Sequence, residues 1–192
     1  MGRDKALLPW PPGSTGASST LLSAVIQALS DFNDLVVVVV GKNEKSLAPL
    51  IYSVGASLVC NPAPERGQFS SLQIGLQQVL DYGRDAAMVT LVDRPPARRE
   101  TLKKLCAAFN SSQDPIWAVV PEFAGKHGHP FLIDRGMITA FLNAPSTATA
   151  RDVEHQNVQH IQYLPVDDPF VTVNVNTPED YEALSASFSQ LK

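Results

Sequence analysis

The run Leu-Val-Val-Val-Val-Val at positions 35–40, closed by Gly41, decides the fold class of this chain. Five β-branched residues in a row favour a strand that is buried on both faces, as in the parallel sheets of α/β proteins. Weaker runs of the same kind follow along the chain. The predicted strands are 35–40, 57–60, 86–92, 116–120, 131–133, 160–164 and 171–175.

Stretches with helical spacing alternate with these runs. Apolar residues fall on one helical face in 21–29, 72–80 and 102–109. The clearest helix start lies near the end, with Thr177 as N-cap, Pro178 as first helical residue and Asp180 at the capping-box position. This alternation predicts an α/β fold, with a mostly parallel sheet and helices on both of its faces.

Length and composition narrow the function classes. The chain has 192 residues, 44% of them apolar, and a net charge of −4. Its length favours a single domain over residues 1–192. The run 35–40 is far shorter than the ~20 residues of a membrane span, and residues 1–5 lead into no secretory signal. The mild acidity weighs against a nucleic-acid partner, and two isolated cysteines, Cys60 and Cys106, suit the cytoplasm. We expect a cytoplasmic protein.

Polar side chains follow the predicted strands, at the edge where α/β proteins carry their chemistry. Asp93 follows 90–92 directly and precedes two prolines, and Asn176 follows 171–175. Carboxylate and amide oxygens on neighbouring strand ends are ligands for a hard divalent cation such as Mg²⁺. Asp93 has a second interpretation, as a cap of the following turn or helix.

Three further segments each allow a functional and a structural interpretation. Arg3 and Lys5 either neutralise a polyphosphate or are solvated charges on a terminus. The stretch 67–71 either offers helix N–H groups to an anionic or carbonyl ligand, or is N-capped by Ser70. The basic loop 125–130 either faces a substrate or is a surface turn, and its two histidines lack a third metal ligand nearby in sequence.

Together these segments resemble the MobA-like NTP transferase family, and within it the molybdopterin cytidylyltransferases. Residues 1–9 (Met-Gly-Arg-Asp-Lys-Ala-Leu-Leu-Pro) are similar to the second half of the family's opening signature. Five more matches follow in order over the rest of the chain. They are Asn61-Pro62 with Gly67 and 71–76, Asp93-Arg94-Pro95, Gly128-His129-Pro130, Asp167-Asp168-Pro169 and 176–181.

The resemblance implies a three-layer, Rossmann-like nucleotidyltransferase fold and assigns roles to residues. Lys5 and Asp93 would be catalytic, and Asp93 and Asn176 would hold Mg²⁺. The implied nucleotide-binding residues are Gly2, Arg3, Lys5, Asn61, Gly67, Ser71 and Arg94. The implied acceptor-binding residues are Lys126, His127, Gly128 and His129.

The chain departs from the family pattern at three places. Arg94 stands where the family has Gln, which adds a cation beside the metal site, and Asn176 stands where many members have Asp. The family's first strand and glycine-rich loop would precede Met1, and that strand is central to the family's sheet. We therefore expect unpaired strand edges and exposed apolar helix faces, with weak or no activity for this chain. Either a start codon assigned too late or a naturally shortened copy would explain the departure.

The implied reaction is attack of a phosphate on the α-phosphate of an NTP, with release of pyrophosphate. The resemblance favours CTP as the nucleotide and a molybdopterin-type cofactor as the phosphorylated acceptor, with a molybdoenzyme as a further partner. Two alternatives stay open. One is a nucleotidyltransferase for a sugar phosphate or another small phosphate, and the other is an inactive nucleotide-binding protein of molybdoenzyme maturation.

Overall fold

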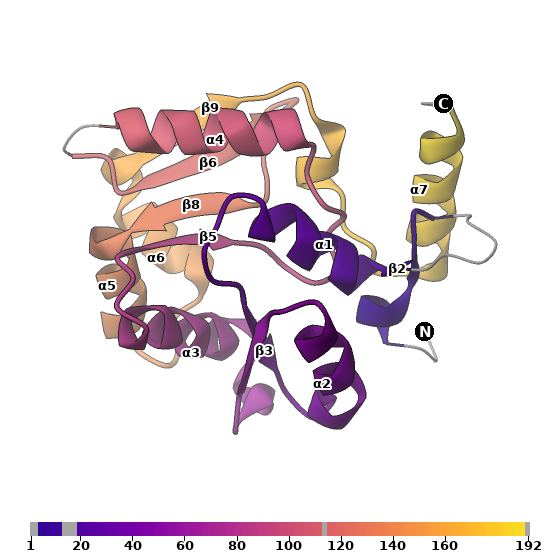
Figure 1. The fold of residues 1–192 in the computed structure, drawn as a ribbon. Helices are drawn as coiled ribbons and strands as arrows, with labels where there is room; N and C mark the ends of the chain where they lie inside the picture. Colours follow the sequence, from indigo (N-terminus) through magenta and orange to yellow (C-terminus); the bar gives the residue numbers. More distant parts are fainter. Residues whose placement is uncertain (1–3, 13–18, 113–114, 191–192) are drawn as a thin grey trace.

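The strands form three separately paired groups in a computed structural model that describes residues 4–12, 19–112 and 115–190 (Figure 1). Strand β3 pairs in parallel with β4, and β1 pairs antiparallel with β2. The largest group has the order β5-β8-β6-β7, with β9 parallel to β6. The strands are β1 (Pro9–Trp10), β2 (Ser19–Thr20), β3 (Val37–Val40), β4 (Ser57–Cys60), β5 (Ala86–Val89), β6 (Ala118–Phe123), β7 (Lys126–His127), β8 (Phe131–Asp134) and β9 (Ile161–Pro165).

Helices cover both faces of the strands, so the fold has three layers as expected (Figure 1). The α helices are α1 (Leu21–Ser30), α2 (Glu44–Ser53), α3 (Gln68–Asp81), α4 (Arg99–Ser111), α5 (Arg135–Asn143), α6 (Ala150–Gln156) and α7 (Pro178–Gln190). Short 3₁₀ turns are η1 (Lys5–Leu7), η2 (Pro64–Arg66), η3 (Val158–His160) and η4 (Pro169–Thr172). None of the helices in the described residues has the length and apolar character needed to cross a bilayer.

Side chains that alternate along the strands fill the two layers between strands and helices. In β8, Phe131 and Ile133 pack with α3, α5 and α6, whereas Leu132 packs with Leu105 of α4 on the opposite face. A separate apolar cluster joins α1 and α2 to β3 through Leu22, Ile26, Val40 and Ile51. The burial that the Val-rich run at 35–40 predicts is only partial, because Val40 is buried whereas Val37, Val38 and Val39 are half-buried and line a cleft.

The sheet is interrupted between β3 and β5, because no pairing among the described residues joins these two strands. Helix α3 packs against both of them and spans the interruption. Its contact with β3 is tight at Gly75, where an added Cβ would lie 2.9 Å from Cγ2 of Val39. The interruption agrees with the expectation of unpaired strand edges.

Segment 171–175 corrects one sequence-based prediction, since it is not a strand. Pro169 opens η4, and the Asp168 side chain accepts from Phe170 N and caps that turn. Val171 and Val175 are nevertheless fully buried. Each makes a single backbone bond to the site segments, with His129 N donating to Val171 O and Val175 N donating to Asp93 O (both 2.8 Å). The alternating apolar residues therefore predicted burial correctly, but the segment does not pair with another strand.

Helices α2, α5 and α6 were not predicted. In α2, Pro49 lies inside the helix, where proline removes a backbone donor and argues against helix, yet Leu47 and Ile51 bury the i, i+4 face. The start of α3 also differs from the capping interpretation. The helix begins at Gln68, Gly67 occupies its N-cap position without a side-chain bond, and Ser70 lies within the first turn.

Candidate functional site

A cleft of about 1570 Å³ is lined along its length by residues of β3 and β5 and of helices α1 and α3. Asp93, Arg94 and His129 line one part of it, and Gly67 and Ser71 line another. In the described residues, three buried side-chain polar atoms lack a hydrogen-bond partner: Asp93 Oδ1, Arg94 Nε and His129 Nδ1. Because buried polar groups are nearly always paired, three orphans around one cleft make it a candidate site for a polar ligand.

Lys5 and Asn176 come from distant parts of the chain and lie close to Asp93, which lines the cleft. The Lys5 ammonium donates to Asn176 Oδ1 (2.9 Å) and lies 3.9 Å from Asp93 Oδ2. Its neighbour Asp4 caps η1 by accepting from Ala6 N (3.0 Å), and it also accepts from Asn43 Nδ2 (2.7 Å). These bonds fix the backbone that carries Lys5.

The loop before α7 orients Asn176. Asp180 accepts from the backbone N–H groups of Asn176 (2.8 Å) and Thr177 (2.9 Å), and Thr177 Oγ1 accepts from Asp180 N (3.2 Å). This is the capping box that the sequence predicts. The N–H groups of Thr177 and Asn176 lower the pKa of Asp180, so it stays ionised at neutral pH. The box therefore holds Asn176 in place beside Lys5.

The chemistry of Asp93 and Asn176 fits a divalent cation. Asp93 does not cap α4, whose N-cap is Arg98, so the capping interpretation of Asp93 has no support for that helix. One of its carboxylate oxygens is orphaned and the other is 3.9 Å from Lys5. The described residues contain no group of three or more His, Cys, Asp or Glu suited to a metal. Mg²⁺ commonly uses only one or two carboxylates together with substrate phosphates and waters, which agrees with this sparse donor set.

Arg94 and His129 are held by the same backbone carbonyl. Val171 O accepts from Arg94 Nη1 (3.1 Å) and from His129 N (2.8 Å). The preceding Gly128 has no room for a side chain, because a Cβ there would lie 2.5 Å from Val171 O. Burial, with the Arg94 guanidinium as the second cause, lowers the pKa of His129 to about 4. His129 is therefore neutral at pH 7 and able to donate or accept a hydrogen bond.

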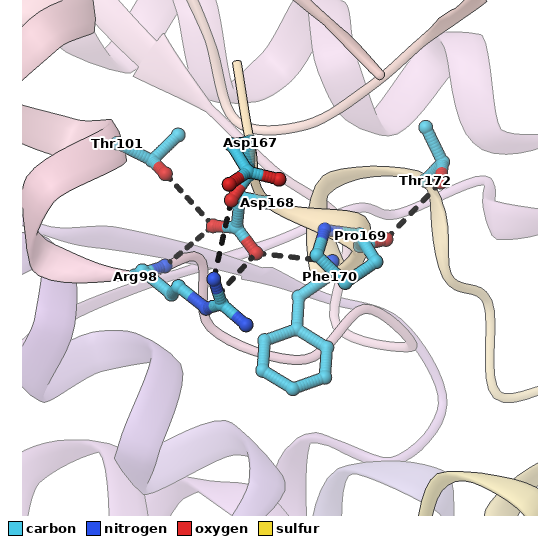
Figure 2. Close-up of polar contacts among 7 residues, drawn as sticks. All are labelled: Arg98, Thr101, Asp167, Asp168, Pro169, Phe170 and Thr172. Carbon is cyan, nitrogen blue, oxygen red and sulfur yellow. Dashed lines mark hydrogen bonds and ion pairs between the residues drawn. The ribbon is translucent and has the colours of Figure 1, made fainter. Parts of the chain in front are cut away.

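The buried Asp168 fixes the turn that presents Val171 (Figure 2). One carboxylate oxygen accepts from Phe170 N (3.1 Å). The other accepts from Arg98 N (2.8 Å) and Thr101 Oγ1 (2.9 Å), and the Arg98 side chain adds an ion pair at 3.8 Å. The carboxylate thus ties η4 to the start of α4. Its partner in the motif, Asp167, is exposed.

Asn61, Gly67 and Ser71 meet at the start of α3. Asn61 is buried, and its Nδ2 donates to Ser70 Oγ and Ser71 Oγ (both 2.9 Å) while its Oδ1 accepts from Ala63 N (2.9 Å). Ser71 and Gly67 line the cleft, whereas Asn61 lies behind them and braces the loop. Asn61 is thus placed to act on a ligand through Ser71.

The remaining predicted residues divide between the cleft and its surroundings. His127 lies on β7 and lines the cleft, stacked on Tyr163 with ring centroids 3.9 Å apart and with Nε2 3.6 Å from Glu122 Oε2. Lys126 is its exposed neighbour on the same hairpin strand. Gly2 and Arg3 lie outside the described residues.

A cleft segment that the sequence did not single out is 146–151, which lies before and at the start of α6. Thr149 and Asp152 form a complete capping box there, with Asp152 Oδ2 accepting from Thr149 N (2.8 Å). The Thr-x-x-Asp spacing is a capping-box pattern that could have predicted the start of this helix. It does not follow a predicted strand, so nothing in the sequence connected it with the site.

The comparison with protein families identifies the family of this chain. The MobA-like NTP transferase domain matches residues 1–162. The chain belongs to this family. It is a nucleotidyltransferase.

Solved structures support the fold of this family member. The Mycobacterium tuberculosis H37Rv protein Rv0371c superposes with a TM-score of 0.79 at 22% identity, covering 97% of this chain and 90% of that one. The same protein in complex with manganese gives 0.75 at 22% identity, with coverage of 96% and 93%. Molybdopterin-guanine dinucleotide biosynthesis protein A from Archaeoglobus fulgidus gives 0.69 at 17% identity, with coverage of 98% and 92%. No curated protein matches the sequence at a significant level.

Proposed function

We propose that this nucleotidyltransferase binds an NTP and a divalent cation in the cleft and transfers the nucleotidyl group to the phosphate of a small acceptor. The observation that supports this proposal most directly is the set of three buried polar atoms without a hydrogen-bond partner on Asp93, Arg94 and His129. One is an anionic acceptor, one a cationic donor and one belongs to a neutral imidazole. A metal–polyphosphate ligand supplies partners for the first two, since it is itself both cationic and anionic.

Asp93 and Asn176 would hold the cation. A divalent metal, when bound there, polarises a phosphoryl oxygen and neutralises charge that develops in the transition state. Mg²⁺ is the ion proposed for this chain, and the manganese complex of the Mycobacterium tuberculosis neighbour supports a divalent ion.

Lys5 and Arg94 supply fixed positive charge on two sides of Asp93. The Lys5 ammonium carries phosphate charge once it exchanges its bond to Asn176 for a phosphoryl oxygen. Arg94 is anchored at Nη1 by Val171 O, so its free Nε is oriented before the ligand arrives. Such preorganised charge stabilises the transferring phosphoryl group and positions it for attack.

The acceptor side is formed by His127, His129 and the tight Gly128 backbone. His129 is neutral, so it can accept or donate a hydrogen bond without repelling the cation. Ser71 and Gly67, at the start of α3, offer hydroxyl and backbone groups to the nucleobase. We propose CTP as the nucleotide and a molybdopterin-type cofactor as the acceptor, on the strength of the sequence resemblance.

Pyrophosphate release tests this function. The chain is incubated with CTP, GTP or ATP, Mg²⁺ or Mn²⁺, and a phosphorylated pterin acceptor. Activity is expected to be weak and to fall at least 100-fold in Asp93→Asn, which keeps the size of the side chain and removes its charge. The matched control is Asp81→Asn, at an exposed position at the end of α3. Equal turnover in the two variants would refute the role of Asp93. Nucleotide binding without pyrophosphate release would favour the inactive nucleotide-binding alternative.

A further inference from the structure

A half-buried carboxylate in the wall of the cleft has no role in the chemistry described so far. Glu154 lies on α6 and lines the cleft, directly after Val153, which anchors this helix in the core. It also borders a small apolar pocket that Phe131 helps to form. Burial raises the pKa of Glu154, and the charges of His155 and Arg151 offset this effect only in part. Among the described residues its carboxylate has no hydrogen bond and no ion pair, so it is a free acceptor beside the cleft.

Two stacked aromatic rings lie next to Glu154. The rings of Tyr163 on β9 and His127 on β7 have centroids 3.9 Å apart at an interplanar angle of 10°, and both residues line the cleft. Their strands pair with β6 on opposite sides, where Tyr163 is the partner of Val120 and His127 the partner of Glu122. Burial first, then the charges of Glu154 and Glu122, raise the pKa of Tyr163, because both carboxylates lie near its phenol. This part of the wall is therefore aromatic and anionic.

The same wall continues into the part of the cleft proposed to bind phosphate. The His129 ring contacts Phe131, with centroids 5.1 Å apart, and Phe131 borders the same small pocket as Glu154. On its other side, His129 shares the Val171 carbonyl with Arg94. The cleft thus has a cationic end at Arg94 and an anionic end at Glu154, with the neutral His129 between them. Because like charges repel, a phosphorylated acceptor binds with its phosphate toward Arg94 and its uncharged part toward Glu154.

We propose that Glu154, Tyr163 and His127 form the subsite for the ring of the acceptor, and that this ring is a flat heterocycle with adjacent N–H donors on one edge. This inference rests on the proposed function, because it divides one acceptor between the two ends of the cleft. The aromatic side chains supply a flat surface for the ring. An ionised carboxylate only accepts hydrogen bonds, and its two oxygens match two parallel N–H groups.

The chemistry of the subsite distinguishes between the acceptors considered above. The 2-amino-4-oxo edge of a pterin presents a ring N–H beside an amino group, as guanine also does. A sugar phosphate has neither a flat face nor paired N–H donors. The subsite therefore favours a pterin-type acceptor over a sugar phosphate, on an observation that is independent of the sequence resemblance.

The test compares binding of 6-methylpterin and 6-methyllumazine by saturation-transfer NMR, without nucleotide or metal. The two molecules differ at one position, where lumazine has a carbonyl oxygen in place of the amino group. We expect the 192-residue chain to bind the pterin about tenfold more tightly, because the lumazine oxygen would face the Glu154 carboxylate. Tyr163→Leu should weaken both ligands alike, since stacking does not distinguish the two rings.

Glu154→Gln should abolish the preference for the pterin. A glutamine amide keeps the size of the side chain, and it can donate to the lumazine carbonyl as well as accept from an N–H group. The matched control is Glu182→Gln, at an exposed position of α7, which should keep the preference. A purely structural role of Glu154 would weaken both ligands and leave their ratio unchanged.

Three outcomes would overturn the inference. They are no binding of 6-methylpterin, equal binding of the two ligands to the unchanged chain, and a preference that survives in Glu154→Gln. Guanosine is the third probe, because it carries the same edge. We expect it to bind more weakly than 6-methylpterin, and tighter binding that depends on Glu154 would assign the subsite to the nucleobase instead. Because no turnover is measured, failure here leaves the Asp93→Asn assay free to support the proposed function, and absence of pyrophosphate release leaves the ring subsite in place.

Discussion

Replacing Asp168 by asparagine isolates the part played by one buried carboxylate in the shape of the site. The side chain is fully buried and accepts three hydrogen bonds, from Phe170 N, Arg98 N and Thr101 Oγ1. Asparagine has the same shape but only one acceptor oxygen. Its amide group must therefore face a backbone N–H, either at Phe170 or at Arg98, which leaves a buried donor unpaired.

The expected cost follows from these contacts. A hydrogen bond to a charged group contributes about 1.5–3 kcal/mol, and an unpaired buried donor adds a desolvation penalty of comparable size. Because the effects are not additive, we expect Asp168→Asn to lower the free energy of unfolding by about 2–4 kcal/mol. Asp168→Ala, which also leaves Arg98 without its ion-pair partner, should lower it by about 3–5 kcal/mol.

Urea unfolding followed by circular dichroism measures these differences, with Asp167→Asn as the matched control. Asp167 is exposed, so its substitution should change stability by less than about 0.5 kcal/mol. The same Asp168 variant should raise the pKa of His129 in NMR titrations, since η4 carries the Val171 carbonyl that fixes this loop. An unfolding midpoint equal to that of Asp167→Asn would refute the assignment of Asp168 as the anchor of η4.

Three further predictions follow from the site. The pKa of His129 is lowered to about 4 in the folded protein, against 6.5 when unfolded, so the unfolded chain binds a proton at a higher pH than the folded one. The free energy of unfolding should therefore fall by up to about 3 kcal/mol between pH 6.5 and 4. In urea unfolding, His129→Gln should remove that pH dependence. Gly128→Ala, whose Cβ would meet the Val171 carbonyl, should destabilise the folded protein by more than about 2 kcal/mol in thermal melts. The control Gly125→Ala lies in open space at φ +73° and should destabilise it by only about 1 kcal/mol. Equal losses of stability in the two variants would contradict the close approach of Gly128 to Val171. Lys5→Met should tighten Mn²⁺ binding about tenfold, measured by electron paramagnetic resonance, because the Lys5 ammonium no longer competes for the Asp93 carboxylate. The same variant should weaken CTP binding, because a positive charge for the phosphates is lost. Weaker Mn²⁺ binding would contradict the proposed metal site.

The fold was largely predictable because its signals are local. The run of valines forms a strand as predicted, although only Val40 of it is fully buried, and the Thr177–Asp180 capping box works within four residues. The failures also have local causes. Helix α2 was missed because Pro49 lies inside it and proline argues against a helix. The segment around the buried Val171 has the apolar pattern of a strand, but Asp168 and Pro169 impose a turn. Alternation of apolar residues reports burial, and a ladder needs a partner strand as well.

The site was predictable only in part, because its geometry is set by distant contacts. The predicted strand ends were enough to single out Asp93 and Asn176, although in the structure β5 ends at Val89 and residues 171–175 form no strand. Nothing local shows that Lys5 reaches Asn176 across 171 positions, and the family resemblance assigned the two residues separate roles without indicating this contact. The bracing role of Asn61 was also invisible, since a buried amide and a ligand-facing amide look alike in sequence.

The tight packing of α3 on β3 sets a distance in this molecule. At Gly75 the helix has no side chain, and even a methyl group would push against Val39. Because α3 also packs on β5, the absence of a side chain at Gly75 helps to set the spacing between β3 and β5, which do not pair with each other. The absence of a side chain at Gly75 therefore sets the width of the cleft, one helical turn from Ser71 on the same helix.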